Sequence, residues 1–128
     1  MARILVVDDE EGIRTLLRNI LVREGHHVTT AADGVEALQV VDTQPVDLVI
    51  TDLIMPEKEG VETISELRKR FPAVKIIAMS GGGMGGAMDY LRLAKALGAG
   101  HTLPKPFTRE VLLKMVEAAL PATPPDET

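Results

Sequence analysis

Four carboxylates follow a run of branched aliphatic residues near the start of the chain. Residues 4–14 read ILVVDDEEGIR, which places Asp8, Asp9, Glu10 and Glu11 at the end of a segment with the composition of a buried strand. Carboxylates repel one another, and a carboxylate beside a hydrophobic core loses favourable hydration. Either these residues are solvated loop or helix-cap residues, or at least two of them are held together for a chemical purpose. Taken alone, Asp8 and Asp9 are explained well enough as caps of a following helix.

Polar residues also follow three other apolar runs. Asp52 comes shortly after the run at 46–50, Ser80 comes after the run at 74–79, and Lys105 follows a weaker run near 101–103. Each has an ordinary explanation, because turns, glycine-rich loops and solvated lysines are all common at strand ends. Their significance depends on whether the fold brings them together.

The elements that must position these residues are predicted by the hydrophobic pattern. Five short apolar runs alternate with five amphipathic stretches whose apolar residues recur at helical spacing. The runs are 4–7, 28–31, 46–50, 74–79 and 101–103, and the helical stretches are 13–21, 35–41, 61–67, 91–97 and 111–120. Such alternation predicts an α/β fold in which a parallel sheet is covered by helices on both faces.

In an open α/β sheet, ligands bind outside the carboxyl ends of the strands. The predicted sheet would therefore gather three carboxylates, those of Asp8, Asp9 and Asp52, at one edge. The Ser80 hydroxyl and the Lys105 ammonium would lie at the same edge. Clustered carboxylates favour a divalent cation, and hard oxygen ligands select Mg2+ over Zn2+. A metal and a lysine can together neutralise a phosphoryl group. We interpret the set as a site for phosphoryl transfer to a carboxylate.

Composition limits the class of protein. The chain has 128 residues, enough for one domain with one core, and a final stretch at 121–128 that we expect to be a disordered tail. The formal net charge of −5 argues against direct nucleic-acid binding. The absence of cysteine excludes a disulfide scaffold and cysteine zinc sites. We expect no membrane span and no signal peptide, and a cytoplasmic location.

Four motifs match a known family. They are LVVDDE at 5–10, TDLIMP at 51–56, MSG at 79–81 and LPKPF at 103–107. With these motifs in this order and spacing, the chain resembles the receiver domain of two-component response regulators over nearly its whole length. The resemblance implies a receiver domain over 1–120. Its fold would be a flavodoxin-like, doubly wound, five-stranded parallel sheet of order 2-1-3-4-5 with five helices.

The resemblance also implies a role for each site residue. Asp52 is similar to the phosphoacceptor of the family and, with Asp9 and the backbone carbonyl of Ile54, to its direct Mg2+ ligands. Asp8 would act on the metal through water. Ser80 and Lys105 resemble the hydroxyl and the lysine that bind phosphoryl oxygens, and the bond from Lys105 to the following proline is expected to be cis.

The function implied is that of a stand-alone signalling module rather than an enzyme, one that catalyses only its own phosphorylation and dephosphorylation. Its expected partners are a sensor histidine kinase or phosphotransfer protein and an unknown downstream protein, and we expect a monomer or a weak phosphorylation-dependent dimer. Two alternatives remain. A small Mg2+ phosphohydrolase commonly has a second aspartate two residues after the nucleophile, where this chain has Ile54. A pseudo-receiver scaffold would not need the intact acidic set.

The chain departs from the family pattern at its usual switch residue. The family has an aromatic residue three positions before the lysine, and here that position is Thr102. A threonine cannot exchange the volume of an aromatic ring between two positions. We therefore expect phosphorylation to act through the glycine-rich loop GGGMGG at 81–86, with Met84 docking as the loop becomes ordered.

Overall fold

A computed structural model describes residues 2–52, 60–81, 92, 95–96 and 98–120 of the chain. Within this part the elements are β1 (Arg3–Val7), α1 (Glu11–Arg23), β2 (His27–Ala31), α2 (Gly34–Thr43), β3 (Leu48–Asp52), α3 (Gly60–Arg70), β4 (Lys75–Gly81), β5 (His101–Lys105) and α5 (Arg109–Ala119). The described part therefore holds four helices, not the five predicted. The helix predicted at 91–97 falls mostly on residues outside that part, as do the loop at 82–86 and the tail at 121–128. No helix of the described residues is long and apolar enough to cross a membrane.

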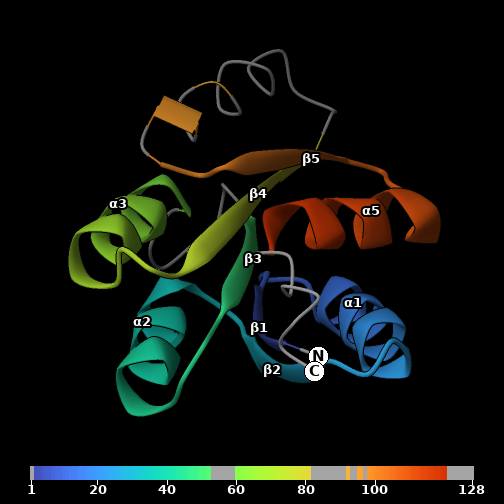
Figure 1. Cartoon of the computed structure of the whole chain (residues 1–128), viewed down its shortest axis with the longest axis horizontal. Helices are drawn as coiled ribbons and strands as arrows, with labels where there is room; N and C mark the ends of the chain where they lie inside the picture. Colours follow the sequence, from blue (N-terminus) through green and yellow to red (C-terminus); the bar gives the residue numbers. More distant parts are fainter. Residues whose placement is uncertain (1, 53–59, 82–91, 93–94, 97, 121–128) are drawn as a thin grey trace, which may run out of the picture.

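The five strands form one parallel sheet in the order β2-β1-β3-β4-β5 (Figure 1). This is the predicted order. The strand ends differ from the prediction: β3 begins two residues later and extends to Asp52, β4 extends to Gly81, and β5 extends to Lys105. Pairing explains the extension, because Asp52 lies opposite Met79 and Gly81 lies opposite Lys105. Asp52 and Lys105 are thus the last residues of their strands, and Ser80 lies within β4, whereas Asp8 and Asp9 follow the end of β1.

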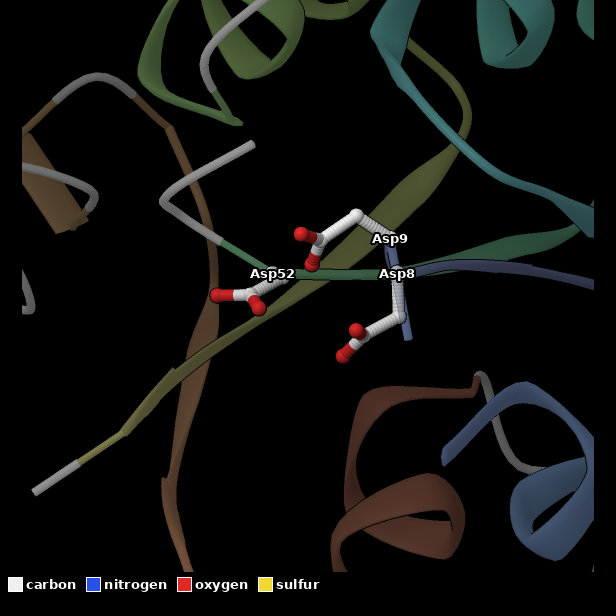
Figure 2. Close-up of side chains that lie close together, drawn as sticks. All are labelled: Asp8, Asp9 and Asp52. Atoms are coloured by element: carbon white, nitrogen blue, oxygen red, sulfur yellow. The ribbon is translucent and has the colours of Figure 1, made fainter. Parts of the chain in front are cut away.

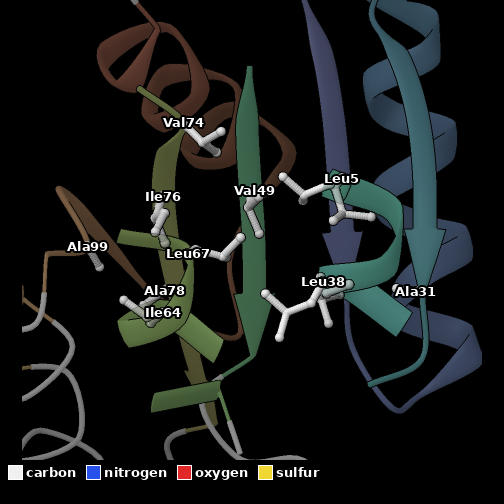
Figure 3. Close-up of a cluster of buried hydrophobic side chains, with 13 residues drawn as sticks. Leu5, Ala31, Leu38, Val49, Ile64, Leu67, Val74, Ile76, Ala78 and Ala99 are labelled. Carbon is white, nitrogen blue, oxygen red and sulfur yellow. The ribbon is translucent and has the colours of Figure 1, made fainter. Parts of the chain in front are cut away.

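Helices cover both faces of the sheet, with α2 and α3 on one face and α1 and α5 on the other (Figure 1). Alternate residues of the apolar runs point to opposite faces. In β1, Leu5 and Val7 pack with α2 and α3, whereas Ile4 and Val6 pack with α1 and α5. The first of these two cores is drawn in Figure 3. Two buried faces explain why the runs are continuously apolar rather than alternating.

The ends of the helices follow local chemistry. Asp33 caps α2 by accepting a hydrogen bond from the Glu36 amide, and Thr108 caps α5 by accepting one from the Val111 amide. Gly25 and Gly98 stand beyond helical segments with φ angles of 91° and 118°, which only glycine adopts readily. At these two points the chain turns back toward the sheet, before β2 and before β5.

Candidate functional site

Asp8 is the first residue beyond β1, and its polar atoms all have partners. The residue is fully buried. Its amide donates to the Ala31 carbonyl at 3.1 Å, and its carbonyl accepts from Arg14 Nη1 at 2.7 Å. In the carboxylate, Oδ1 accepts from the Glu10 amide at 2.9 Å and Oδ2 accepts from Lys105 Nζ at 2.8 Å. Burial of this charge is possible because each oxygen is hydrogen-bonded.

Neither Asp8 nor Asp9 is the cap of α1. The residue at the cap position is Glu10, whose side chain makes no capping hydrogen bond, and Glu11 lies in the first turn. The explanation of the aspartate pair as helix caps is therefore wrong. A carboxylate in the first turn is favoured by the helix dipole, so Glu11 needs no further role.

The three aspartates converge at the carboxyl edge of the sheet. One carboxylate oxygen from each of Asp8, Asp9 and Asp52 lies within 4.8 Å of the others. Asp8 and Asp52 are buried, whereas Asp9 is exposed. Figure 2 shows the three side chains near one another, extending from the chain just beyond β1 and from the end of β3. The convergence predicted from the sequence is confirmed for these residues.

Lys105 joins two of these carboxylates from the end of β5. Its Nζ lies 2.8 Å from Asp8 Oδ2 and 3.1 Å from Asp52 Oδ2, and its side chain is 15% exposed. Burial alone would lower the pKa of Lys105, but the hydrogen bond to Asp8 and the charge of Asp52 outweigh that effect, so the pKa is raised. The lysine is therefore charged and balances part of the acidic cluster. This ion pair with Asp8 was not predicted from the sequence.

Asp52 ends the most buried strand of the sheet. All five residues of β3 are buried, and β3 lies between β1 and β4. The neighbouring Thr51 hydroxyl donates to the Asp52 carbonyl at 3.0 Å. The carboxylate thus stands on a rigid strand beside the other two acids, with only 11% of its side chain exposed. Rigid placement of this kind suits a reacting group.

Ser80 and Ile54 are described less fully. The backbone of Ser80 lies in β4 opposite Pro104 of β5, which puts it on the same edge as Lys105, but its side chain is outside the described part of the structure. Ile54 also lies outside it. The bond between Lys105 and Pro106 is cis, as the resemblance implied. Thr102 lies within β5, opposite Ala78 and half-buried.

Sequence reasoning missed Arg14. Its guanidinium binds the backbone carbonyl of Asp8, and no motif of side-chain types marks a bond of this kind. The one indication in the sequence is its position six residues after Asp8, in the first turns of α1. A long side chain there can reach the main chain at the end of β1. Arg14 is thus a neighbour of the acidic cluster, and its contact with the cluster is made through the main chain of Asp8.

The donor set suits a hard divalent cation. Carboxylate oxygens from three residues meet at one point, and such oxygens are the preferred ligands of Mg2+ and Ca2+. Histidine, a usual ligand of Zn2+, is absent from the cluster. Among the described residues, the Lys105 ammonium is the one ammonium group that pairs with carboxylates of this cluster, which leaves negative charge for a metal ion to balance. The geometry therefore fits a divalent metal next to the Asp52 carboxylate.

Comparison with known proteins identifies the family. The family model for the response regulator receiver domain matches residues 4–117. The transcriptional regulatory protein CpxR of Klebsiella pneumoniae is 38% identical over 122 residues, covering 94% of this chain and 50% of CpxR. The response regulator MprA of a Mycobacterium species is 38% identical over 128 residues, covering 98% of this chain and 53% of MprA. The chain thus spans about half the length of these curated relatives.

Solved structures agree in fold over nearly the whole chain. The chemotaxis protein CheY4 of Vibrio cholerae matches with a TM-score of 0.85 and 34% identity, covering 94% of this chain and 99% of CheY4. The response regulator TrrA of Thermotoga maritima, solved in complex with Mg2+-BeF, matches with a TM-score of 0.82 and 37% identity, covering 94% of this chain and all of TrrA. With the family match, the sheet order and the acidic cluster in agreement, this chain belongs to the receiver domains of two-component response regulators.

Proposed function

We propose that Asp52 accepts a phosphoryl group from a phosphohistidine of a sensor histidine kinase or phosphotransfer protein, with Mg2+ held by the acidic cluster. The observation that supports this most strongly is the convergence of the Asp52 carboxylate with Asp8, Asp9 and the Lys105 ammonium at one edge of the sheet. A carboxylate oxygen of Asp52 attacks the phosphorus, the phosphorus–nitrogen bond to the imidazole breaks, and the electron pair stays on the leaving nitrogen.

The metal and each residue of the site would have a separate role. Bound Mg2+ supplies positive charge that stabilises the transferring phosphoryl oxygens. Asp9 and Asp52 would hold it directly, with the Ile54 carbonyl. Both carboxylate oxygens of Asp8 already accept hydrogen bonds, which supports a role for Asp8 through a metal-bound water. Lys105 is placed to donate to a phosphoryl oxygen on Asp52, and the Ser80 hydroxyl would donate to another.

The phosphorylated domain would signal through protein contact. Its only catalysis would be its own phosphorylation and dephosphorylation, since Ile54 stands where a phosphohydrolase of this type commonly has a second aspartate. The downstream partner would recognise the surface changed by phosphorylation. TrrA, a relative of similar length, was solved with a beryllium fluoride group and Mg2+, which supports testing the same combination on this chain.

Labelling with a small phosphodonor tests the proposal. The full chain, incubated with acetyl phosphate and Mg2+, is expected to gain one phosphoryl group in its intact mass. Asp52→Asn should abolish the gain, whereas the control Asp42→Asn, which alters an exposed ion pair with Arg70, should leave it unchanged. Labelling that persists in Asp52→Asn, or that is as strong after chelation of the metal, would refute the assignment.

A further inference from the structure

Arg14 makes a hydrogen bond that connects α1 to the acidic cluster. Its Nη1 donates to the carbonyl oxygen of Asp8 at 2.7 Å. The side chain is half-buried, and within the described part of the chain it forms no ion pair with a carboxylate. Its charge is therefore directed to a main-chain oxygen, and a hydrogen bond from a charged donor is stronger than a neutral one.

The carbonyl that Arg14 binds lies where the chain leaves the sheet. The pairing of β1 with β2 and β3 ends at Val7, so the Asp8 carbonyl has no partner in the strand ladder. The next residue is Asp9, the exposed member of the cluster. Among the hydrogen bonds of the described residues, none holds the Asp9 carboxylate, so its position depends on the main chain at the preceding peptide.

We propose that Arg14 is a positioning residue of the metal site. By fixing the peptide that joins Asp8 to Asp9, it sets the direction in which the Asp9 carboxylate faces Asp52. This inference rests on the proposed function, because it concerns the Mg2+ that phosphorylation would require. It goes beyond that function by assigning a role to a residue outside the set of ligands and phosphoryl-binding groups.

The direction of the effect separates positioning from simple electrostatics. Arg14 places a positive charge against the main chain of Asp8, a member of the cluster, and a cation repels Mg2+. If charge alone mattered, removing Arg14 would tighten Mg2+ binding. If Arg14 orients the ligands, removing it weakens Mg2+ binding despite the loss of repulsion, because partners that orient metal ligands contribute about tenfold or more to affinity.

The choice of metal gives a second readout. Mg2+ requires near-ideal octahedral geometry, whereas Ca2+ tolerates irregular coordination. A loss of ligand orientation should therefore reduce Mg2+ affinity more than Ca2+ affinity. A change in charge affects both divalent ions alike, and so does a general loss of stability, so neither alters the ratio of the two affinities.

The chain offers a matched control. Arg68 Nη1 donates to the carbonyl of Val74, also at 2.7 Å and also six residues away in sequence, and Arg68 is likewise half-buried. Val74 immediately precedes β4 (Lys75–Gly81), so this bond lies at the amino edge of the sheet, opposite the acidic cluster. Arg68→Met removes the same kind of bond without touching the site.

The experiment is calorimetric titration of the metal-free wild type, Arg14→Met and Arg68→Met with Mg2+ and, separately, with Ca2+. For Arg14→Met we expect the Mg2+ Kd to rise about tenfold and the Ca2+ Kd to rise less than about threefold. Arg68→Met should match the wild type for both ions. If Arg14→Met fails to fold, Arg14→Lys, which keeps the charge but not the planar fork, should lower the Mg2+ to Ca2+ affinity ratio in the same direction.

Two failures are distinguishable. A wild type that binds neither ion refutes the metal site of the proposed function itself. A wild type that binds Mg2+, together with an Arg14 variant that binds it as tightly or more tightly, or with an unchanged affinity ratio, refutes the positioning role alone.

Discussion

The three aspartates of the site differ in how firmly the protein holds them. Asp8 is buried with both carboxylate oxygens bonded, Asp52 ends a fully buried strand, and Asp9 is exposed. Lys105 binds the two buried ones. The lysine therefore does part of what a metal ion would do, namely balancing charge that burial would otherwise make costly. The Lys105 ammonium and a bound Mg2+ ion should therefore compete for the same carboxylates.

Replacing the lysine tests this competition. Lys105→Ala should lower the metal-free free energy of unfolding by about 3 kcal/mol, because a buried charge loses its partner. The same change should tighten Mg2+ binding, since a repelling cation is removed. The measurements are urea denaturation and thermal unfolding with and without Mg2+, with Lys114→Ala, on the exposed side of α5, as control. A smaller Mg2+ stabilisation than in the wild type would contradict the idea that Lys105 and the metal compete.

At the scale of the elements, two glycines with positive φ stand at the amino edge of the sheet, one before β2 and one before β5. Gly98 precedes β5 with a φ of 118°, and a Cβ at this position would lie 2.6 Å from Cγ of Arg68. Arg68 cannot move freely, because its guanidinium is bonded to the Val74 carbonyl. By contrast, Gly25 has a φ of 91° with open space where a Cβ would be. The two glycines therefore share a backbone requirement but differ in packing.

This difference predicts unequal effects of the same substitution. Gly25→Ala should cost about 1–2 kcal/mol from backbone strain alone. Gly98→Ala should cost about 1 kcal/mol more, because the Arg68 hydrogen bond must be displaced. The excess is the amount by which Gly98→Ala lowers the free energy of unfolding more than Gly25→Ala does. Chemical denaturation measures it when both substitutions are made in the wild type and again in an Arg68→Ala background. The excess should vanish in that background, and an excess that survives would show that Arg68 is not its cause.

How much of this architecture the sequence predicts depends on the kind of interaction. The continuous apolar runs predict β1, β3 and β4 because these strands are buried on both faces, and the convergence of the strand ends predicts the acidic cluster. The strand ends themselves were misplaced, because polar residues such as Asp52 continue the pairing. Arg14 was missed because it recognises a main-chain oxygen, which no side-chain pattern records. The loop predicted to act as the switch at 81–86 lies almost wholly outside the described residues, so that mechanism stays a prediction.

At the scale of the whole molecule, the sheet separates two hydrophobic cores and its two edges carry different groups. The carboxyl edge gathers the acids and Lys105. At the amino edge, the Ala2 amide donates to His26 Nδ1 at 3.1 Å, which ties the start of β1 to the start of β2. Burial and the nearby amino terminus lower the pKa of His26. The folded protein thus favours the neutral imidazole, whose Nδ1 can accept this bond.

The pH dependence of stability follows with a definite sign. The folded-state pKa of His26 lies below the unfolded value of 6.5. The stabilisation that comes from the neutral His26 side chain is therefore complete above pH 6.5, and it is lost as the pH falls through the lowered folded-state pKa. Between about pH 6.5 and 5, above the range in which most carboxylates titrate, the free energy of unfolding should decline. His26→Gln should reduce this decline, with His27→Gln, an exposed neighbour, as control. A decline as steep in His26→Gln as in the wild type would assign it to other groups.

The central claim is that Asp52, and neither of its two acidic neighbours, receives the phosphoryl group with the help of a metal. Borohydride reduction converts an aspartyl phosphate to homoserine, and peptide mass spectrometry then locates the modified position. After reaction of the full chain with acetyl phosphate and Mg2+, homoserine should appear at the position of Asp52 alone, and its yield should fall to background when Mg2+ is chelated. Homoserine at the position of Asp8 or Asp9, or an equal yield without Mg2+, would contradict the account.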